Sequence, residues 1–218
     1  MAVAAALTVF AGFARTFYLR GLFETKVLSP LLIFHGVLFT SWILLFLVQV
    51  RLVAAKRTDL HRRLGVVVAL LAALMPVVGF AAAIASAKHG FTPHGGPPPL
   101  VFLMIPLTDL VVFSTLVGTG FYFRRRSEIH KRLMLLATLG ILTPAIARVP
   151  FVTPFGLPVF LGLTDLFIVT CLIYDRITRG RIHPAFLWGG LFIIISQPVR
   201  MLIAGTHAWL AFATWLTR

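Results

Sequence analysis

The chain is short of cysteine and of acidic residues. It has one cysteine, Cys171, and only six Asp and Glu among 218 residues. A single cysteine excludes an intramolecular disulfide, a cysteine-rich zinc site, an iron–sulfur cluster and a CxxCH haem attachment. Charged residues make up 12% of the chain and hydrophobic residues 59%, whereas a soluble domain carries about 25% charged residues. The chain is therefore expected to lie in a lipid bilayer as an integral membrane protein.

Seven apolar stretches are long enough to cross a membrane, for which a helix needs about 20 residues. They predict an all-α membrane protein with about seven transmembrane helices in one domain, residues 1–218. The first stretch contains Arg15 and is the weakest, and a cleaved signal peptide is the alternative for it, although it lacks a basic leading region. The tail, residues 206–217, is too short to span and is expected at the interface. The predicted spans are residues 2–19, 30–50, 64–86, 99–122, 131–149, 157–174 and 184–205.

The basic residues gather in the loops on one side of the predicted helices. Thirteen of the 20 Lys and Arg residues fall in the loops that follow the second, fourth and sixth stretches. The positive-inside rule places these loops in the cytoplasm, which predicts a bacterial inner-membrane protein with a cytoplasmic N-terminus and an external C-terminus. Because this topology accounts for the formal charge of +14, the charge does not indicate nucleic acid as a partner.

The sequence repeats itself around the three basic loops. Residues 58–64 (TDLHRRL) match residues 127–133 (SEIHKRL) by type at all seven positions, and residues 181–184 (RIHP) are a fainter third copy. Upstream, residues 107–110 (LTDL) recur as residues 163–166 (LTDL). Such self-similarity indicates a repeated supersecondary unit. We therefore expect six of the helices to form three helical hairpins of the same kind after residue 29.

A histidine opens the returning helix of each predicted hairpin: His61, His130 and His183. Thr58 and Ser127 are favourable N-cap residues, and the acid that follows each complements the positive helix end. Capping does not explain the recurring histidine, whose neutral imidazole is a ligand for metals and for haem iron. The three histidines are therefore candidate ligands of haem b or of a transition metal. Packing at the membrane interface and binding of a lipid headgroup are the alternatives.

A second polar group lies inside the predicted spans, in their outer halves. The repeat aligns His35 with Asp109 and Asp165, which are the only acids within spans. An ionised carboxylate in lipid is costly, so both should face the bundle interior, either in ion pairs that fix helix register or in a site for a cation, a proton or a polar substrate. The candidate partners are the arginines near outer helix ends: Arg15, Arg148 and Arg200. The other acids are expected in loops: Glu24, Asp59, Glu128 and Asp175.

Several segments resemble a family of bacterial multi-pass membrane proteins with repeated HRRLG and HKRLM hairpins. The resemblance covers nearly the whole chain and implies an integral inner-membrane protein, without an established activity. A looser similarity to transmembrane b-type cytochromes and to membrane factors of haem–copper oxidase assembly implies histidine ligands on successive helices. Those cytochromes usually bury their ligands a few turns inside the helix, whereas His61 and His130 lie at its start. The segments that carry the family resemblance are residues 14–20 (ARTFYLR), 34–36 (FHG), 60–65 (LHRRLG), 130–134 (HKRLM), 146–148 (IAR) and 196–198 (SQP).

Three function classes follow from these patterns. The first is a haem- or metal-binding redox or accessory subunit of a larger membrane energy-converting complex, in which His61 and His130 are ligands together with His183 or His35. The second is a transporter of a small solute or a proton-coupled carrier, built around His35, Asp109 and Asp165. The third is a purely structural membrane subunit. The recurrence of histidine favours the first class, and no pairing of a nucleophile with a base indicates an enzyme.

Overall fold

The computed structural model describes residues 1–23, 27–93 and 96–218, and these residues form helices and no strand. Six helical segments are long and apolar enough to cross a membrane. The predicted all-α membrane fold is therefore confirmed. The six segments are α2 (Pro30–Ala54), α3 (Thr58–Lys88), α4 with α5 (Pro99–Phe102 and Met104–Tyr122), α6 with α7 (Ser127–Gly140 and Thr143–Ile146), η3 with α8 (Thr153–Phe155 and Gly156–Arg179) and α9 (Pro184–Ala204).

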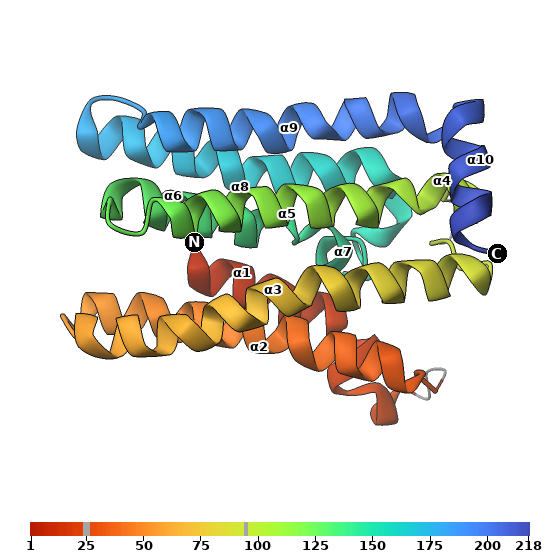
Figure 1. Cartoon of the computed structure of the whole chain (residues 1–218), viewed down its shortest axis with the longest axis horizontal. Helices are drawn as coiled ribbons and strands as arrows, with labels where there is room; N and C mark the ends of the chain where they lie inside the picture. Colours follow the sequence, from red (N-terminus) through yellow and green to blue (C-terminus); the bar gives the residue numbers. More distant parts are fainter. Residues whose placement is uncertain (24–26, 94–95) are drawn as a thin grey trace.

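The first predicted span, residues 2–19, forms a shorter helix. α1 (Ala2–Phe13) continues into a π-helical turn, η1 (Ala14–Tyr18), which a 3-10 turn, η2 (Arg20–Leu22), follows. At about 1.5 Å per residue α1 and η1 together reach about 25 Å, less than the roughly 30 Å of a hydrocarbon core. Figure 1 shows the N-terminus part-way along the bundle, and α1 packs against α2 and α7. The described residues thus form six segments long enough to span a membrane, with the short helix α1 packed among them.

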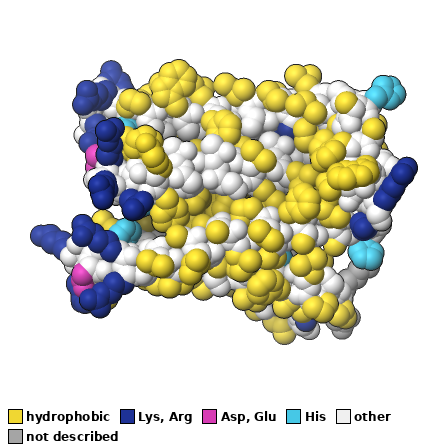
Figure 2. All heavy atoms as spheres, in the orientation of Figure 1, with side chains coloured by type: hydrophobic (Ala, Val, Ile, Leu, Met, Phe, Trp, Pro, Cys, Tyr) yellow, Lys and Arg dark blue, Asp and Glu magenta, His cyan; other side chains and the backbone are white. Residues whose placement is uncertain are grey.

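The six spans form three hairpins, α2–α3, α5–α6 and α8–α9, whose turns all lie at the same end of the bundle (Figure 1). These turns are residues 55–57, 123–126 and 180–183. Lysine and arginine side chains gather at this end (Figure 2), and we call it the basic end. The opposite end carries the C-terminus and α10 (His207–Leu216), which lies across the ends of the spans in Figure 1. The predicted tail is therefore a short helix that does not span the bundle.

Local sequence explains how several of these helices begin and end. Ser29 precedes Pro30 and its hydroxyl accepts a hydrogen bond from the Leu32 N–H at 3.3 Å, which caps α2. Thr206 caps α10 in the same way through the Trp209 N–H. At the basic end, Gly180 terminates α8 with a φ of 70°, a left-handed conformation that glycine adopts without a steric penalty.

The first two hairpins are joined in the core by Trp42 of α2. Its ring meets Phe113 of α5 edge to face, with ring centroids 5.0 Å apart, and its indole N–H donates to the Thr138 hydroxyl of α6 at 3.3 Å. The buried indole thus has both an apolar partner and a hydrogen-bond acceptor. Large apolar side chains cover much of the outer surface between the two ends (Figure 2). This distribution suits helices that contact lipid.

Candidate functional site

Two of the three recurring histidines meet at the basic end. His61 lies in the first turns of α3 and His130 in the first turns of α6, so they belong to the returning helices of the first and second hairpins. Their ring centroids are 6.3 Å apart and the ring planes stand 79° to one another. Both side chains are half-buried. The structure therefore brings together two predicted ligands that are 69 positions apart in the sequence.

The hydrogen bonds around this pair leave ring nitrogens free. His130 Nδ1 lies 2.8 Å from the Gly120 carbonyl oxygen of α5, so this nitrogen carries the proton and donates, and Nε2 is left as the basic nitrogen. His61 Nδ1 is buried and has no hydrogen-bond partner among the described residues. A histidine that ligates a metal commonly donates its other ring N–H to a carbonyl or carboxylate oxygen. His130 already has this arrangement.

Gln49 of α2 is the third polar side chain at the pair, and the sequence analysis missed it. It is 8% exposed, and its amide donates from Nε2 to the backbone carbonyl of His61 at 3.2 Å. Its Oε1 is buried without a hydrogen-bond partner among the described residues. The only available signal was a single glutamine within the apolar stretch 30–50. Gln49 thus ties α2 to the start of α3 beside the imidazole of His61.

His183, the third recurring histidine, lies in a different group. It is the N-cap of α9: its Nδ1 accepts a hydrogen bond from the Ala185 N–H at 3.1 Å, and its own backbone N–H donates to Asp175 Oδ2 at 2.8 Å. Partial burial of the ring and then the Arg132 guanidinium hold the pKa of His183 below its usual value. The three-histidine set predicted from the sequence therefore divides into a pair and a helix cap.

A buried ion pair between Arg132 of α6 and Asp175 of α8 joins the second hairpin to the third. The Arg132 guanidinium donates to the two carboxylate oxygens of Asp175 at 2.5 Å and 3.3 Å, and the two side chains are only 4% and 3% exposed. Arg132 also donates to Glu128 at 2.8 Å, and Arg179 pairs with the same carboxylate. Arg132 is one of the thirteen basic residues that the sequence places in loops, and sequence reasoning missed this network.

The expectation that four acids lie in loops is wrong for the three that the structure describes. Asp59 and Glu128 lie in the first turns of α3 and α6, where the positive helix end favours a carboxylate. Asp175 lies within α8, which continues to Arg179 because the Arg132 pair satisfies its carboxylate. Glu24 lies outside the described residues.

The predicted N-caps at Thr58 and Ser127 are each off by one residue. Arg57 and Arg126 hold the N-cap positions, and their carbonyl oxygens accept the first intrahelical hydrogen bonds, from the N–H groups of His61 and His130 at 3.0 Å. Neither arginine makes a side-chain capping hydrogen bond. Thr58 and Ser127 are therefore the first residues inside their helices.

Asp109, Asp165 and Arg200 come together toward the opposite end, where they join α5, α8 and α9. Arg200 donates to Asp109 Oδ1 at 2.5 Å, and both side chains are nearly fully buried. Asp165 accepts a hydrogen bond from Gln197 Nε2 at 2.7 Å. Of the three arginines considered as partners, Arg200 is thus the one that pairs with Asp109. The pair neutralises both charges and fixes how α9 faces α5.

His35 and Arg148 lie apart from that group, and no hydrogen bond or ion pair joins them to Asp109 or Asp165 within the described ranges. His35 stacks on Phe39 of the same helix with ring centroids 4.2 Å apart. Arg148 follows the end of α7 and donates to the Pro144 carbonyl at 2.7 Å. The five residues predicted as one substrate or ion layer therefore do not form a single group: Asp109, Asp165 and Arg200 lie together, and His35 and Arg148 lie apart from them.

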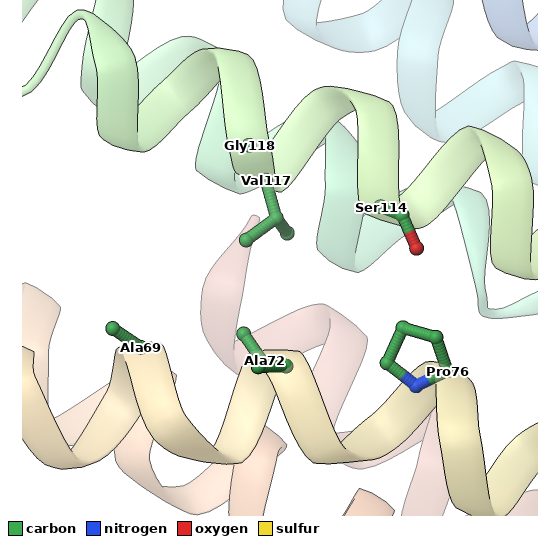
Figure 3. Close-up of a pocket in the computed structure, with 7 residues that line it drawn as sticks. Ala69, Ala72, Pro76, Ser114, Val117 and Gly118 are labelled. Carbon is green, nitrogen blue, oxygen red and sulfur yellow. The ribbon is translucent and has the colours of Figure 1, made fainter.

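A groove of about 290 Å³ lies between α3 and α5 (Figure 3). Its residues are mostly small and face one another across the two helices. On the α5 side it ends at Gly118, two positions before Gly120, whose carbonyl accepts from His130. On the α3 side the groove begins at Ala69, about two helical turns from His61 toward the middle of the bundle. Its lining residues are Ala69, Ala72, Ala73, Pro76, Ser114, Val117 and Gly118.

No protein-family model matches the chain, and no curated protein or solved structure matches it either. The resemblance to the bacterial multi-pass family and the looser similarity to b-type cytochromes stay predictions. Among the residues that the structure describes, no three His, Cys, Asp or Glu side chains lie close enough to share a metal ion. The chemistry of the site therefore has to be argued from the pair itself.

Proposed function

We propose that this chain is a multi-pass protein of the bacterial inner membrane that binds haem b through His61 and His130 and serves a redox or accessory role in a membrane energy-converting complex. The observation that carries the proposal is the approach of the two imidazole rings from different hairpins. A metal lies about 2 Å from a ligating nitrogen and so about 3 Å from the ring centroid. The two ring centroids are 6.3 Å apart, so His61 and His130 are near enough that both would reach one metal held between them.

The number of ligands favours haem iron over a bare transition metal. A structural zinc ion takes four protein ligands and a catalytic one takes three, and the pair at the basic end supplies two. A haem brings most of its iron's ligands with it, so the protein would need to supply only one or two, here His61 and His130. Cys171, the chain's single cysteine, is buried in α8, so a thiolate does not complete the pair. A haem is therefore the group that two histidines serve best.

The residues around the histidine pair suit the propionates of a haem and its flat apolar ring. Arg62, Arg63 and Lys131 are exposed neighbours of the two histidines along α3 and α6, and arginine and lysine pair well with carboxylates such as propionates. The groove between α3 and α5, with its small side chains, offers an approach for a flat apolar group from the bilayer (Figure 3). Haem b thus has a polar contact at the basic end and an apolar one beside it.

The charge distribution supports one orientation in the membrane. The basic end carries the turns of all three hairpins (Figure 1) and many Lys and Arg side chains (Figure 2), and we infer that it faces the cytoplasm by the positive-inside rule. The C-terminus is then external. α1 runs from the basic side toward the opposite end in Figure 1, the direction that a cytoplasmic N-terminus requires.

An absorption spectrum with metal analysis of the detergent-purified protein tests the proposal. We expect a Soret band that His61→Ala and His130→Ala each abolish. His183→Asn is the matched control, because asparagine also caps helices and this histidine lies in another group; it should keep the band. A colourless, metal-free protein that also fails to bind added haemin would refute the proposal.

Transport through the polar group around Asp165 is a second candidate function. Its carboxylate is only partly buried and is bound by the neutral amide of Gln197, whereas Asp109 is held in an ion pair with Arg200. An acid inside a membrane helix that makes no salt bridge among the described residues is a candidate for proton or cation binding. Asp165→Asn should then abolish proton-coupled flux in vesicles while the protein stays folded. Unchanged flux would exclude this function.

A further inference from the structure

Arg148 is a cation within the bundle that has no acidic partner among the described residues. It follows α7, at the point where the returning helix of the second hairpin ends at Ile146. Its Nη1 donates to the Pro144 carbonyl at 2.7 Å, and its guanidinium lies over the Phe13 ring, 4.8 Å from the centroid. The described carboxylates that pair with arginines are engaged elsewhere, Asp109 with Arg200 and Asp175 with Arg132. Within residues 1–23, 27–93 and 96–218, the Pro144 carbonyl is therefore the one hydrogen-bond acceptor of this guanidinium.

The half-buried side chain of Arg148 keeps guanidinium donors that a ligand can reach. A guanidinium presents five N–H donors in a fixed fork that matches the oxygens of a carboxylate or phosphate. The carbonyl of Pro144 and the face of Phe13 satisfy only part of this capacity. Charged side chains inside a membrane protein are retained chiefly where they have a partner or a function. The N–H donors of Arg148 that remain are therefore available to an acceptor that the described residues do not supply.

The short N-terminal helix forms one wall around Arg148. The Cα of Gly12 in α1 lies so close to the Ala145 carbonyl of α7 that a Cβ there would collide with it. On the other side, Gly36 of α2 packs against the Phe17 ring of η1, and the Tyr18 hydroxyl is 2.9 Å from the Thr40 hydroxyl of α2. α1 is thus held firmly between α2 and α7 (Figure 1), and the π-helical turn at its end is a feature that often accompanies functional sites.

His35 supplies a second unused polar group in this region. It lies in the second turn of α2, one position before the Gly36 that contacts η1. Its Nδ1 is buried and has no hydrogen-bond partner among the described residues. Arg148 lies over the Phe13 ring, and Phe17, four positions later in the same N-terminal segment, packs against Gly36, the residue next to His35. A cation with free donors and a ring nitrogen without a partner therefore share one region, bounded by α1, α2 and α7.

We propose that Arg148 and His35 bind an oxyanion, a carboxylate or a phosphate group, between α1, α2 and α7. Arg148 pairs with two of its oxygens through the guanidinium fork, and His35 donates one further hydrogen bond from Nδ1. The site lies in the half of the bundle away from the basic end, where His61 and His130 lie, and it does not require haem. The anion comes from a lipid headgroup of that leaflet or from a soluble molecule on that side of the membrane.

The experiment measures anion binding by the full-length protein in detergent and in nanodiscs. The soluble probes are inorganic phosphate and acetate, and the shift in melting temperature reports their binding. The lipid probe is phosphatidylglycerol compared with phosphatidylcholine, and native mass spectrometry reports its binding. Arg148→Gln should raise the half-saturating concentration of the effective probe by about tenfold or more, the change that about 1.4 kcal/mol produces. His35→Gln should raise it less, and Arg148→Lys should fall between wild type and Arg148→Gln because lysine keeps the charge without the fork.

Lys88→Gln is the charge-matched control, because Lys88 is an exposed cation at the C-terminal end of α3 and removing it changes net charge equally. It should bind the probes as wild type does. A response to phosphate or acetate identifies a soluble anion, and a response to phosphatidylglycerol alone identifies a headgroup. The proposal is wrong if wild type and Arg148→Gln respond alike to all probes, or if Lys88→Gln weakens binding as much as Arg148→Gln.

Discussion

Replacing Asp175 with alanine removes the carboxylate that Arg132 and the His183 N–H share at the basic end. Taking away one partner of a buried ion pair costs about 3–5 kcal/mol, because the other charge stays buried and unpaired. Arg132 keeps its contact with Glu128 at 2.8 Å, but the Glu128 side chain is 41% exposed and compensates little. We therefore expect Asp175→Ala to lower the free energy of unfolding by about 3 kcal/mol, the lower end of that range.

The matched control comes from the repeat. Arg63 occupies the position in the first hairpin that Arg132 occupies in the second, but it is exposed, so Arg63→Gln should change stability by less than about 0.5 kcal/mol. The double variant Arg132→Met/Asp175→Leu should recover most of the loss, since apolar replacement of a buried pair is often neutral. Reversible unfolding by SDS, followed by the helical circular dichroism signal, gives all four values. The reasoning fails if Asp175→Ala costs no more than Arg63→Gln, or if the double variant is no more stable than Asp175→Ala.

Three further predictions concern other parts of the bundle. Gly12→Leu should separate α1 from α7, because its Cβ would meet the Ala145 carbonyl; limited proteolysis should then cut the N-terminal helix faster than in Gly21→Ala, whose Cβ meets no described atom. At His183, the lowered pKa favours the neutral ring in the folded state, so stability is complete above the ordinary pKa of about 6.5 and falls as the pH drops below it. His183→Asn should show a smaller loss of melting temperature than wild type between pH 7 and pH 5, and an equal loss would contradict this account. Gly118→Leu should fill the groove beside the histidine pair and lower haemin uptake, whereas Gly162→Leu, at an exposed glycine of α8 whose Cβ also meets nothing nearby, should bind haemin as wild type does.

Hydrophobic length predicted the spans well at their apolar centres and less well at their ends. α3 begins at Thr58 and α8 continues to Arg179, whereas the apolar stretches begin at residue 64 and end at residue 174. The added turns contain charged residues, which ion pairs and helix-end electrostatics stabilise. The apolar run 2–19 also gave no sign that it would become π-helical after Phe13. That change depends on contacts with α2 and α7 that hydropathy does not describe.

The repeat identified the candidate ligands but could not select among them. It placed His61, His130 and His183 at equivalent positions, and only the packing of the hairpins decides that the first two meet while the third caps α9. The same limit applies to the arginines predicted as partners of Asp109. The packing of α9 on α5 brings Arg200 to Asp109, whereas Arg148 lies elsewhere. Pairing between side chains of different hairpins is a tertiary property, and local sequence does not contain it.

The two interfaces between hairpins differ at the basic end, and this difference explains where the histidine pair lies. Asp175 follows Asp165 by ten positions, and the same step from Asp109 in the repeat reaches Thr119. The second hairpin thus offers no carboxylate to Arg63, which stays exposed, whereas the third hairpin offers Asp175 to Arg132. In the described part of the chain, the interface of the first and second hairpins therefore has no buried ion pair at the basic end. The two imidazoles lie at that interface, and each has a ring nitrogen without a hydrogen bond among the described residues. A group bound between them would link the first and second hairpins as the Arg132–Asp175 ion pair links the second and third.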